Sequence, residues 1–218
     1  MVLPDLFVGV WVRESISVDG GPAREAEDVV WLQGHETFAD VRIPLGDGTS
    51  AVEAFGGTTR WDGSALRWDH ELDWHGAFAE TDLGRIEWVD DVMVERGTMA
   101  VTSFDGARHE VAYEEVWRRE AAGTSVLALG AAAVARRALH VAIDGWSVTL
   151  ARSGPGTFAV RLVRPDAPTV ELGEGGLRAP EPGDAAWGWS VRDERADASR
   201  VGPGVETVSK HDVRRVLP

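Results

Sequence analysis

The stretch 51-AVEAFGGTTRWDGSALRWDHELDW-74 decides the fold. Apolar and polar side chains alternate along it on both sides of Asp62-Gly63, and an Asp-Gly pair between two alternating runs is the strongest short-range sign of a β-hairpin. A two-residue turn there pairs Trp61 with Ser64 and Phe55 with His70. Cross-strand partners share a face. The predicted apolar face holds Phe55, Trp61, Leu66, Trp68, His70, Leu72 and Trp74, and the opposite face holds Arg60, Arg67, Asp69, Glu71, Asp73 and His75.

The segment RWDHELDWHG, residues 67–76, concentrates side chains that bind metals. On a regular strand, however, His70 and His75 point to opposite faces and cannot chelate one ion. The acidic residues that share a face with His75 also share it with Arg67, which favours solvated charge pairs over a metal site. His70 lies on the apolar face between two tryptophans. It is either a core histidine that donates to a carbonyl or a polar group inside a pocket.

A second hairpin is expected around His35-Glu36, with Gln33 opposite Phe38 and Trp31 opposite Asp40. Its two faces differ sharply. One is wholly aliphatic, with Val30, Leu32, Ala39, Val41 and Ile43, and the other mixes aromatic and polar residues, with Val29, Trp31, Gln33, Phe38, Asp40 and Arg42. The mixed face is either a pocket wall or a surface that another part of the chain covers. An ion pair between Asp40 and Arg42 is the simplest account of those two charges.

Alternation continues along most of the chain. Further strands are expected over 8–16, 85–89, 92–96, 109–118, 157–164 and 187–192, with Asp-Gly turn signals at 19–20, 47–48, 105–106 and 144–145. A strong hairpin is expected where Leu139, Val141 and Ile143 face Trp146, Val148 and Leu150. The segment 125–139 could alternatively be a helix, and 209–217 is expected to form a short terminal helix with Ser209 as its cap. Composition changes near 120–124, which predicts two lobes, 1–122 and 123–218.

Composition excludes several classes of protein. The 218 residues carry a formal charge of −14, which argues against nucleic acid or an anionic membrane as partner. Cysteine is absent, so disulfides, thiolate catalysis and cysteine-ligated zinc are excluded. The start lacks a signal-peptide pattern and no apolar run is long enough to span a bilayer, so a cytoplasmic location is expected. No metal or cofactor is expected.

Motifs for catalysis are also missing. The sequence has no Gly-x-Ser-x-Gly, no His-Glu-x-x-His, no phosphate loop and no dinucleotide-binding fingerprint. Carboxylates for an acid–base pair are available at Glu14, Asp40, Glu95 and Glu115, but their separations cannot be read from sequence.

Many antiparallel strands, with tryptophans and a few polar groups on one face, favour closure into a barrel. Gly9-Val10-Trp11 resembles the Gly-x-Trp signature of lipocalin-like barrels, in which an arginine of the last strand stacks on that tryptophan; Arg118 is the matching position. A wider pattern is Asp28-x-x-Trp31-Leu32-Gln33, Phe38-x-Asp40-x-Arg42-x-Pro44, Phe55-x-Gly57-x-Thr59 and Glu115-x-Trp117-Arg118. Over residues 8–118 it resembles an uncharacterised bacterial lipocalin-like family, itself similar to a fungal family with two packed lipocalin-like lobes. The resemblance implies an all-β fold, with an antiparallel barrel followed by a second β-rich lobe, and no catalytic residues.

Three functions remain open. The first is binding of a small, largely apolar ligand in a barrel lined by Trp31, Gln33, Arg42, Phe55, Trp68, His70, Tyr113 and Trp117. Arg42 would favour a ligand with a carboxylate or another anionic group. A haem ligated by His70 is a minor variant. The second is a structural or interaction module, such as a homo-oligomer, in which tryptophans plug the barrel. The third is an enzyme on a hydrophobic small molecule, with His70, Asp40 or Glu95 as base.

Overall fold

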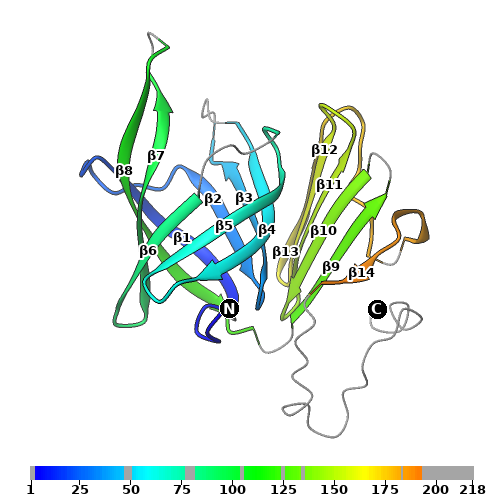
Figure 1. The fold of residues 1–218 in the computed structure, drawn as a ribbon, viewed down its shortest axis with the longest axis horizontal. Helices are drawn as coiled ribbons and strands as arrows, with labels where there is room; N and C mark the ends of the chain where they lie inside the picture. Colours follow the sequence, from blue (N-terminus) through cyan, green and yellow to red (C-terminus); the bar gives the residue numbers. More distant parts are fainter. Residues whose placement is uncertain are drawn as a thin grey trace, which may run out of the picture.

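The computed structural model describes residues 3–46, 51–76, 82–103, 106–123, 126–133, 136–182 and 184–192. The first part is a closed barrel of eight antiparallel strands, in which each strand pairs with the next and β8 pairs back with β1 (Figure 1). The strands are β1 (Gly9–Val18), β2 (Glu27–Gln33), β3 (Thr37–Pro44), β4 (Glu53–Trp61), β5 (Ala65–Asp73), β6 (Asp82–Val89), β7 (Val92–Thr102) and β8 (Arg108–Ala121). The all-β class and the barrel expected from sequence are confirmed.

The second part is a six-stranded antiparallel sheet in the order β13-β12-β11-β10-β9-β14. Its elements are β9 (Val126–Ala133), β10 (Arg136–Ile143), β11 (Trp146–Ser153), β12 (Phe158–Arg164), β13 (Ala167–Gly173), a short 3₁₀ helix (Ala185–Trp187) and β14 (Ser190–Val191). The helix considered for 125–139 is therefore wrong, because β9 and β10 occupy most of it. The strand expected over 187–192 shrinks to two residues, and β13 was missed.

The second sheet covers one side of the barrel from outside (Figure 1). The aliphatic face predicted for β2 and β3 supplies Val30, Leu32, Ala39 and Val41 to this contact. Strands β10, β11 and β12 pack against them with Leu139, Val141, Val148, Leu150 and Val160. All of these side chains are buried. The mixed face of β2 and β3 consequently points into the barrel, so burial on the outside fixes which side chains line the inside.

Strand register explains where sequence reasoning succeeded and where it failed. Gln33 pairs with Phe38 and Trp31 with Asp40, as predicted. At Asp62-Gly63 the turn is longer than predicted, and Trp61 pairs with Leu66 instead of Ser64. A shift of two residues keeps every side chain on its face, because the side-chain period of a strand is two.

A bulge in β5 then reverses the alternation. Gly56 pairs with Leu72 and Gly57 with His70, so Glu71 is the extra residue on β5. Beyond it Leu72 and Trp74 pack in the outer cluster against the second sheet, and Asp73 faces the barrel interior. The predicted face shared by Trp68, Leu72 and Trp74 is therefore wrong in its second half.

Aromatic residues close the base of the barrel. Trp11 donates its indole N–H to the carbonyl of Phe7 and stacks against Trp31. The cation over Trp11 is Arg119, 5.2 Å from the ring, and its guanidinium also donates to the carbonyls of Asp5, Leu6 and Val8. The assignment of this role to Arg118 is wrong by one position, since Arg118 is on the outside and pairs with Glu14 and Glu120.

Within the described ranges no helix is both long and apolar enough to cross a bilayer. The helix predicted at 209–217 and the turn at Asp47-Gly48 lie outside the described residues.

Candidate functional site

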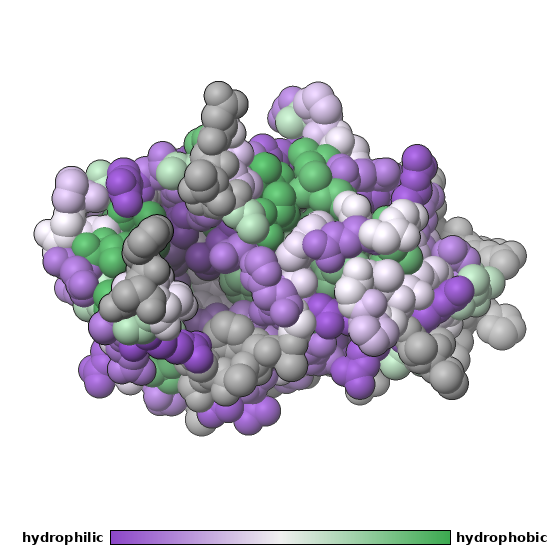
Figure 2. Space-filling model, turned by 90° about the horizontal axis from the view of Figure 1, so that it is seen from above, coloured by the Kyte–Doolittle hydropathy of each residue, from purple (hydrophilic) through white to green (hydrophobic). Residues whose placement is uncertain are grey.

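The barrel encloses a cavity of about 540 Å³ above its aromatic base. Seen from above, the molecule is hollowed at this end of the barrel, and hydrophilic residues gather in the hollow (Figure 2). Seven of the eight residues predicted to bind a ligand line it: Trp31, Arg42, Phe55, Trp68, His70, Tyr113 and Trp117. The eighth, Gln33, does not, because its amide is bound by Gly34, Thr37 and Thr59 in the β2–β3 turn region.

Flat aromatic rings form the lower wall. Trp31 meets Trp68 and Trp117 edge to face, with ring centroids 5.7 and 5.4 Å apart. Phe55 stacks on the imidazole of His70 at 4.4 Å. Trp31 is 2% exposed, and its indole N–H has no hydrogen-bond partner among the described residues. A buried donor of this kind is exceptional in folded proteins.

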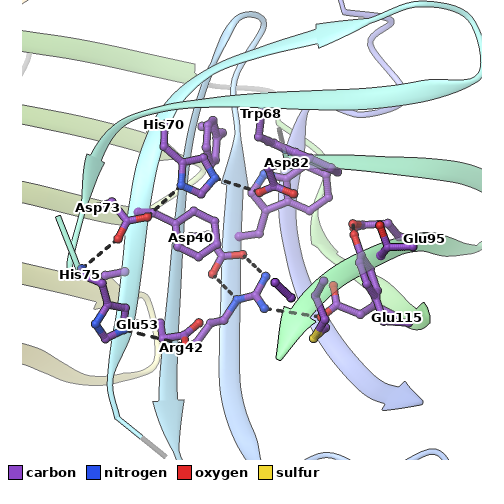
Figure 3. A pocket seen from close by; sticks show the side chains of 18 of the residues that line it. Asp40, Arg42, Glu53, Trp68, His70, Asp73, His75, Asp82, Glu95 and Glu115 are labelled. Carbon is purple, nitrogen blue, oxygen red and sulfur yellow. Dashed lines mark hydrogen bonds and ion pairs between the residues drawn. The ribbon is translucent and has the colours of Figure 1, made fainter. Parts of the chain in front are cut away.

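His70 is held between two carboxylates (Figure 3). Its Nδ1 lies 3.0 Å from Asp73 Oδ2 and its Nε2 lies 2.9 Å from Asp82 Oδ2. Burial opposes the charged form, but the two carboxylates outweigh burial and raise the pKa of His70 to about 9. The ring is therefore an imidazolium at neutral pH, and both of its N–H groups donate. Of the two roles considered for His70, the structure supports a polar group inside a pocket, held by two carboxylates rather than by a carbonyl.

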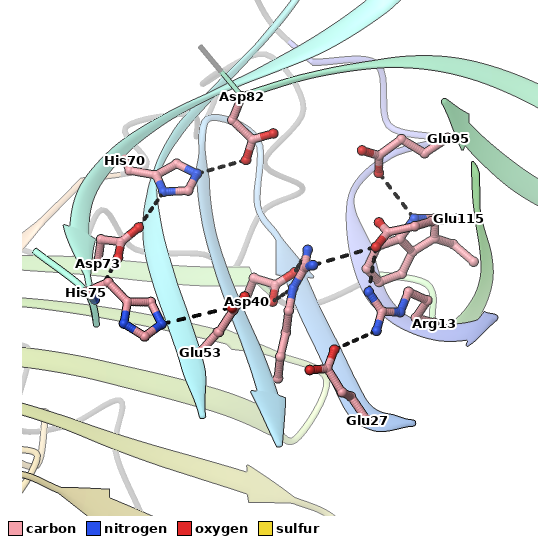
Figure 4. A network of polar contacts seen from close by, with 12 residues as sticks. Arg13, Glu27, Asp40, Glu53, His70, Asp73, His75, Asp82, Glu95 and Glu115 are labelled. Carbon is pink, nitrogen blue, oxygen red and sulfur yellow. Dashed lines mark hydrogen bonds and ion pairs between the residues drawn. The ribbon is translucent and has the colours of Figure 1, made fainter. Parts of the chain in front are cut away.

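Arg42, labelled in Figure 3, belongs to a chain of charges that includes Asp40, Glu115 and Arg13, which are labelled in Figure 4. Its Nε lies 3.1 Å from Asp40 and its Nη1 lies 3.6 Å from Glu115. Arg13, 4% exposed, approaches the same Glu115 at 2.5 Å and also binds Glu25 and Glu27 at 2.7 Å. Buried charges persist when paired in this way.

The ion pair predicted between Asp40 and Arg42 is thus present, and it has an electrostatic consequence. Burial raises the pKa of Asp40 to about 6, although the neighbouring guanidinium acts in the opposite direction. Burial alone would lower the pKa of Arg42, but Asp40 and Glu115 hold it above its usual value. With carboxylates on two sides, Arg42 has little capacity left to fix an anionic ligand.

Glu95 occupies a different environment on the other side of the cavity. It accepts a hydrogen bond from the Tyr113 hydroxyl at 2.6 Å and one from the Trp117 indole N–H at 3.2 Å. Burial, reinforced by Glu115, raises its pKa well above the usual value despite the Tyr113 hydrogen bond. Glu95 therefore holds a proton more readily than an ordinary glutamate.

Two glycines make room for Glu95 and its tyrosine partner. A Cβ at Gly84 would lie 2.5 Å from the Glu95 carboxyl, and a Cβ at Gly97 would lie 2.6 Å from the Tyr113 hydroxyl. These separations are well inside ordinary contact distance, so each side chain lies directly over a strand position without a side chain. The backbone of β6 and β7 is thereby shaped around this pair.

Other residues of the site escaped sequence reasoning. Asp73 and Asp82 line the cavity and hold His70, but the first is turned inward by the β5 bulge and the second belongs to a strand whose start was placed three residues too late. The only available signal was Gly56-Gly57, since glycine inside a strand often marks a bulge. Of the carboxylates considered for acid–base pairs, Asp40, Glu95 and Glu115 line the cavity and Glu14 lies outside, paired with Arg118.

Across the parts of the chain that the structure describes, no group of three or more His, Asp or Glu side chains is placed to hold a metal ion. What the site offers is a flat aromatic wall, fixed charges and two carboxyls, Asp40 and Glu95, whose pKa values are raised by burial. Such a combination binds and orients a small molecule.

Comparison with known proteins places the chain in a family. Residues 9–175 match the family model described as Protein HRI1, and the chain belongs to this family. Its structure is similar to the crystal structure of uncharacterized protein YLR301w from Saccharomyces cerevisiae, with a TM-score of 0.54 and 16% sequence identity over 79% of this chain and 85% of that chain. At this identity the likeness concerns the fold. No curated protein matches the sequence.

Proposed function

We propose that this member of the HRI1 family binds a small organic molecule inside its eight-stranded barrel. The observation that carries the proposal is the cavity of about 540 Å³, which falls within the range of 300–1,000 Å³ usual for small-molecule sites. Barrels of eight strands are wide enough either to be filled by side chains or to hold one small ligand. Here the tryptophans fill the base and leave the upper half to the cavity.

The wall defines the shape of the ligand. Trp31, Trp68, Trp117 and Phe55 present flat apolar faces, so the ligand has a flat or chain-like apolar body. Polar groups around them provide orientation through fixed hydrogen bonds.

The first test combines native mass spectrometry with a blocked barrel. The protein purified from its host is expected to carry a non-covalent small mass, or to bind members of a panel of neutral, cationic and anionic amphiphiles saturably. Met99→Trp is expected to abolish both, because Met99 lines the cavity and the larger side chain occupies part of it. Val101→Trp is the matched control, since Val101 is two residues further along β7, on the same face and outside the cavity lining.

Circular dichroism and urea unfolding establish that both variants fold. No bound mass and no saturable binding across the panel would refute the proposal. Equal binding by wild type and Met99→Trp would show that the ligand lies elsewhere on the molecule.

A further inference from the structure

We infer that the ligand of this barrel is an organic cation, an amine whose ammonium group pairs with Glu95 while its apolar body lies against the tryptophans. The inference rests on the proposed function and names the chemical class of the ligand. It reverses the expectation that Arg42 would select an anion.

The wall of the cavity carries more acidic than basic side chains. The residues that line the cavity include six carboxyl side chains, against two arginines and the imidazolium of His70. A carboxylate excess of this kind repels anions and attracts cations, and it acts more strongly in a partly desolvated cavity than in water.

Five of these six carboxyls lie close to a basic side chain of the protein. Asp40 is bound by Arg42, Glu115 by Arg13, and Glu53 on the rim approaches His75 at 3.9 Å. The imidazolium of His70 serves both Asp73 and Asp82. Four of these carboxyls therefore have a cationic partner, and the fifth, Glu53, has a side chain that is 45% exposed at the rim, where water solvates it.

Glu95 is the exception. Among the described residues it takes part in no ion pair, and both of its hydrogen-bond donors, the Tyr113 hydroxyl and the Trp117 indole N–H, are neutral. It is 4% exposed and seated over Gly84. A buried carboxylate is costly unless a cation accompanies it, and an ammonium group of a ligand would supply the cation that no described residue provides.

The surroundings of Glu95 suit an ammonium group that carries an apolar body. The ring of Trp117 donates to Glu95 and meets Trp31 edge to face at 5.4 Å, so tryptophan rings lie directly beside the carboxyl. The indole rings also offer an apolar surface that suits the hydrocarbon body of an amine. Carboxylate and indole together select an ammonium group with an apolar body over a hydrated metal ion.

Binding of the amine is coupled to the release of a proton. Burial and Glu115 raise the pKa of Glu95 and so favour its protonated form before binding. When the ammonium binds, the carboxyl loses this proton to the buffer and the ammonium donates a hydrogen bond to the carboxylate. The groups that face Glu95 are Tyr113 and Glu115 from β8, Asp82 from β6 and Arg42 from β3. The remaining charges are already paired, so proton release comes from Glu95.

The test uses three probes with one body: 4-phenylbutylamine, 4-phenylbutanol and 4-phenylbutyrate. We expect the amine, as its ammonium ion, to bind at least tenfold more tightly than the alcohol and the carboxylate to bind least, because a charge-assisted hydrogen bond adds a tenfold to hundredfold gain. In Glu95→Gln the amine is expected to lose that advantage, while the alcohol binds as before. The amide oxygen introduced by this substitution can accept from the Trp117 indole N–H, and the amide NH2 group can donate to the Tyr113 hydroxyl, so the site retains its shape.

Glu114→Gln is the matched control. Glu114 lies on the outer side of β8, beside Tyr113 in sequence, and the substitution makes the same change of side chain away from the cavity. Its amine affinity is expected to match that of the wild type. Calorimetry in phosphate and in Tris adds a second measurement: the amine-binding enthalpy of the wild type should differ between the two buffers by the heat of proton release, and that of Glu95→Gln should not.

The outcomes separate the two proposals. Alcohol or carboxylate binding as tight as that of the amine overturns the cation but leaves cavity binding standing. Amine binding that is equally strong in Glu95→Gln overturns the role of Glu95. Failure of all three probes, with no co-purified mass, overturns both proposals.

Discussion

The clamp on His70 makes the stability of the barrel depend on pH. The imidazole lies between Asp73 and Asp82, its side chain is 3% exposed, and its pKa is about 9 in the folded protein against 6.5 as an ordinary value. A rise of that size corresponds to about 3 kcal/mol of folding free energy. Because the folded state binds the proton more tightly, this contribution is fully present below pH 6.5. It is lost as the pH rises through about 9.

The perturbation is His70→Gln, which is neutral at every pH and can donate to only one of the two carboxylates. Urea unfolding followed by circular dichroism is expected to show a loss of about 3 kcal/mol at pH 6, shrinking steadily toward pH 9.5. His75→Gln is the control, because His75 has a side chain 57% exposed, and surface substitutions change stability by less than about 0.5 kcal/mol. A loss for His70→Gln that is the same at pH 6 and pH 9.5 would refute the imidazolium clamp and leave only packing as the explanation.

Three further substitutions test other parts of the structure by the same unfolding assay. Arg119→Ala should lower the free energy of unfolding by about 1–3 kcal/mol, because it removes the cation over Trp11 and the donor to three carbonyls. The neighbouring Arg118→Ala should lower it by less than about 0.5 kcal/mol, and equal losses would contradict the assignment of the stacking arginine. Leu150→Ala in the contact between barrel and second sheet should cost about 2–5 kcal/mol, and the exposed Leu83→Ala almost nothing, so a small loss at the first site would argue against a packed contact. Gly84→Ala should cost about 1–3 kcal/mol, since the new methyl group overlaps the carboxyl of Glu95; wild-type stability would show that the carboxyl lies elsewhere.

Sequence reasoning identified the faces of this fold better than its registers. Alternation alone separated the aliphatic face of β2 and β3, now under the second sheet, from the face that lines the barrel. The hairpin error at Asp62-Gly63 was harmless because it was a shift of two residues. Periodicity reports which side chains lie on the same side of a strand, and it does so without knowledge of the partner strand.

Bulges account for the most instructive errors. The extra residue Glu71 sent Asp73 inward and Trp74 outward, and irregularities between β1 and β8 at Val10/Trp11 and Arg13/Ser15 accompany the misplaced stacking arginine. A bulge depends on the match between two strands, so the pattern of one strand cannot reveal it. Gln33 differs from the other predicted residues for another reason: it lies on the interior face, but its amide is bonded to Gly34, Thr37 and Thr59.

The sequence also could not assign partners to charges. Arg42 was correctly placed on a wall of the barrel, but only the structure shows that β8 brings Glu115 to it and β1 brings Arg13. Both contacts cross from one end of the barrel sequence to the other. Whether an arginine is available for a ligand depends on such distant neighbours, and a local pattern carries no information about them.

The way in which the barrel closes has a consequence for the order of folding. Arg13 and Glu115, which meet across the β1–β8 seam, are 102 positions apart in sequence, so the seam forms only after nearly the whole barrel segment is available. Strands β9 to β13 instead form a meander of local pairings, and local pairings form faster than distant ones. During synthesis the aliphatic outer face of β2 and β3 is therefore made well before the strands of the second sheet that bury it. A chain halted between Ala121 and Val126 would present that face to other chains, which makes the nascent barrel, rather than the finished protein, the species most in need of a chaperone.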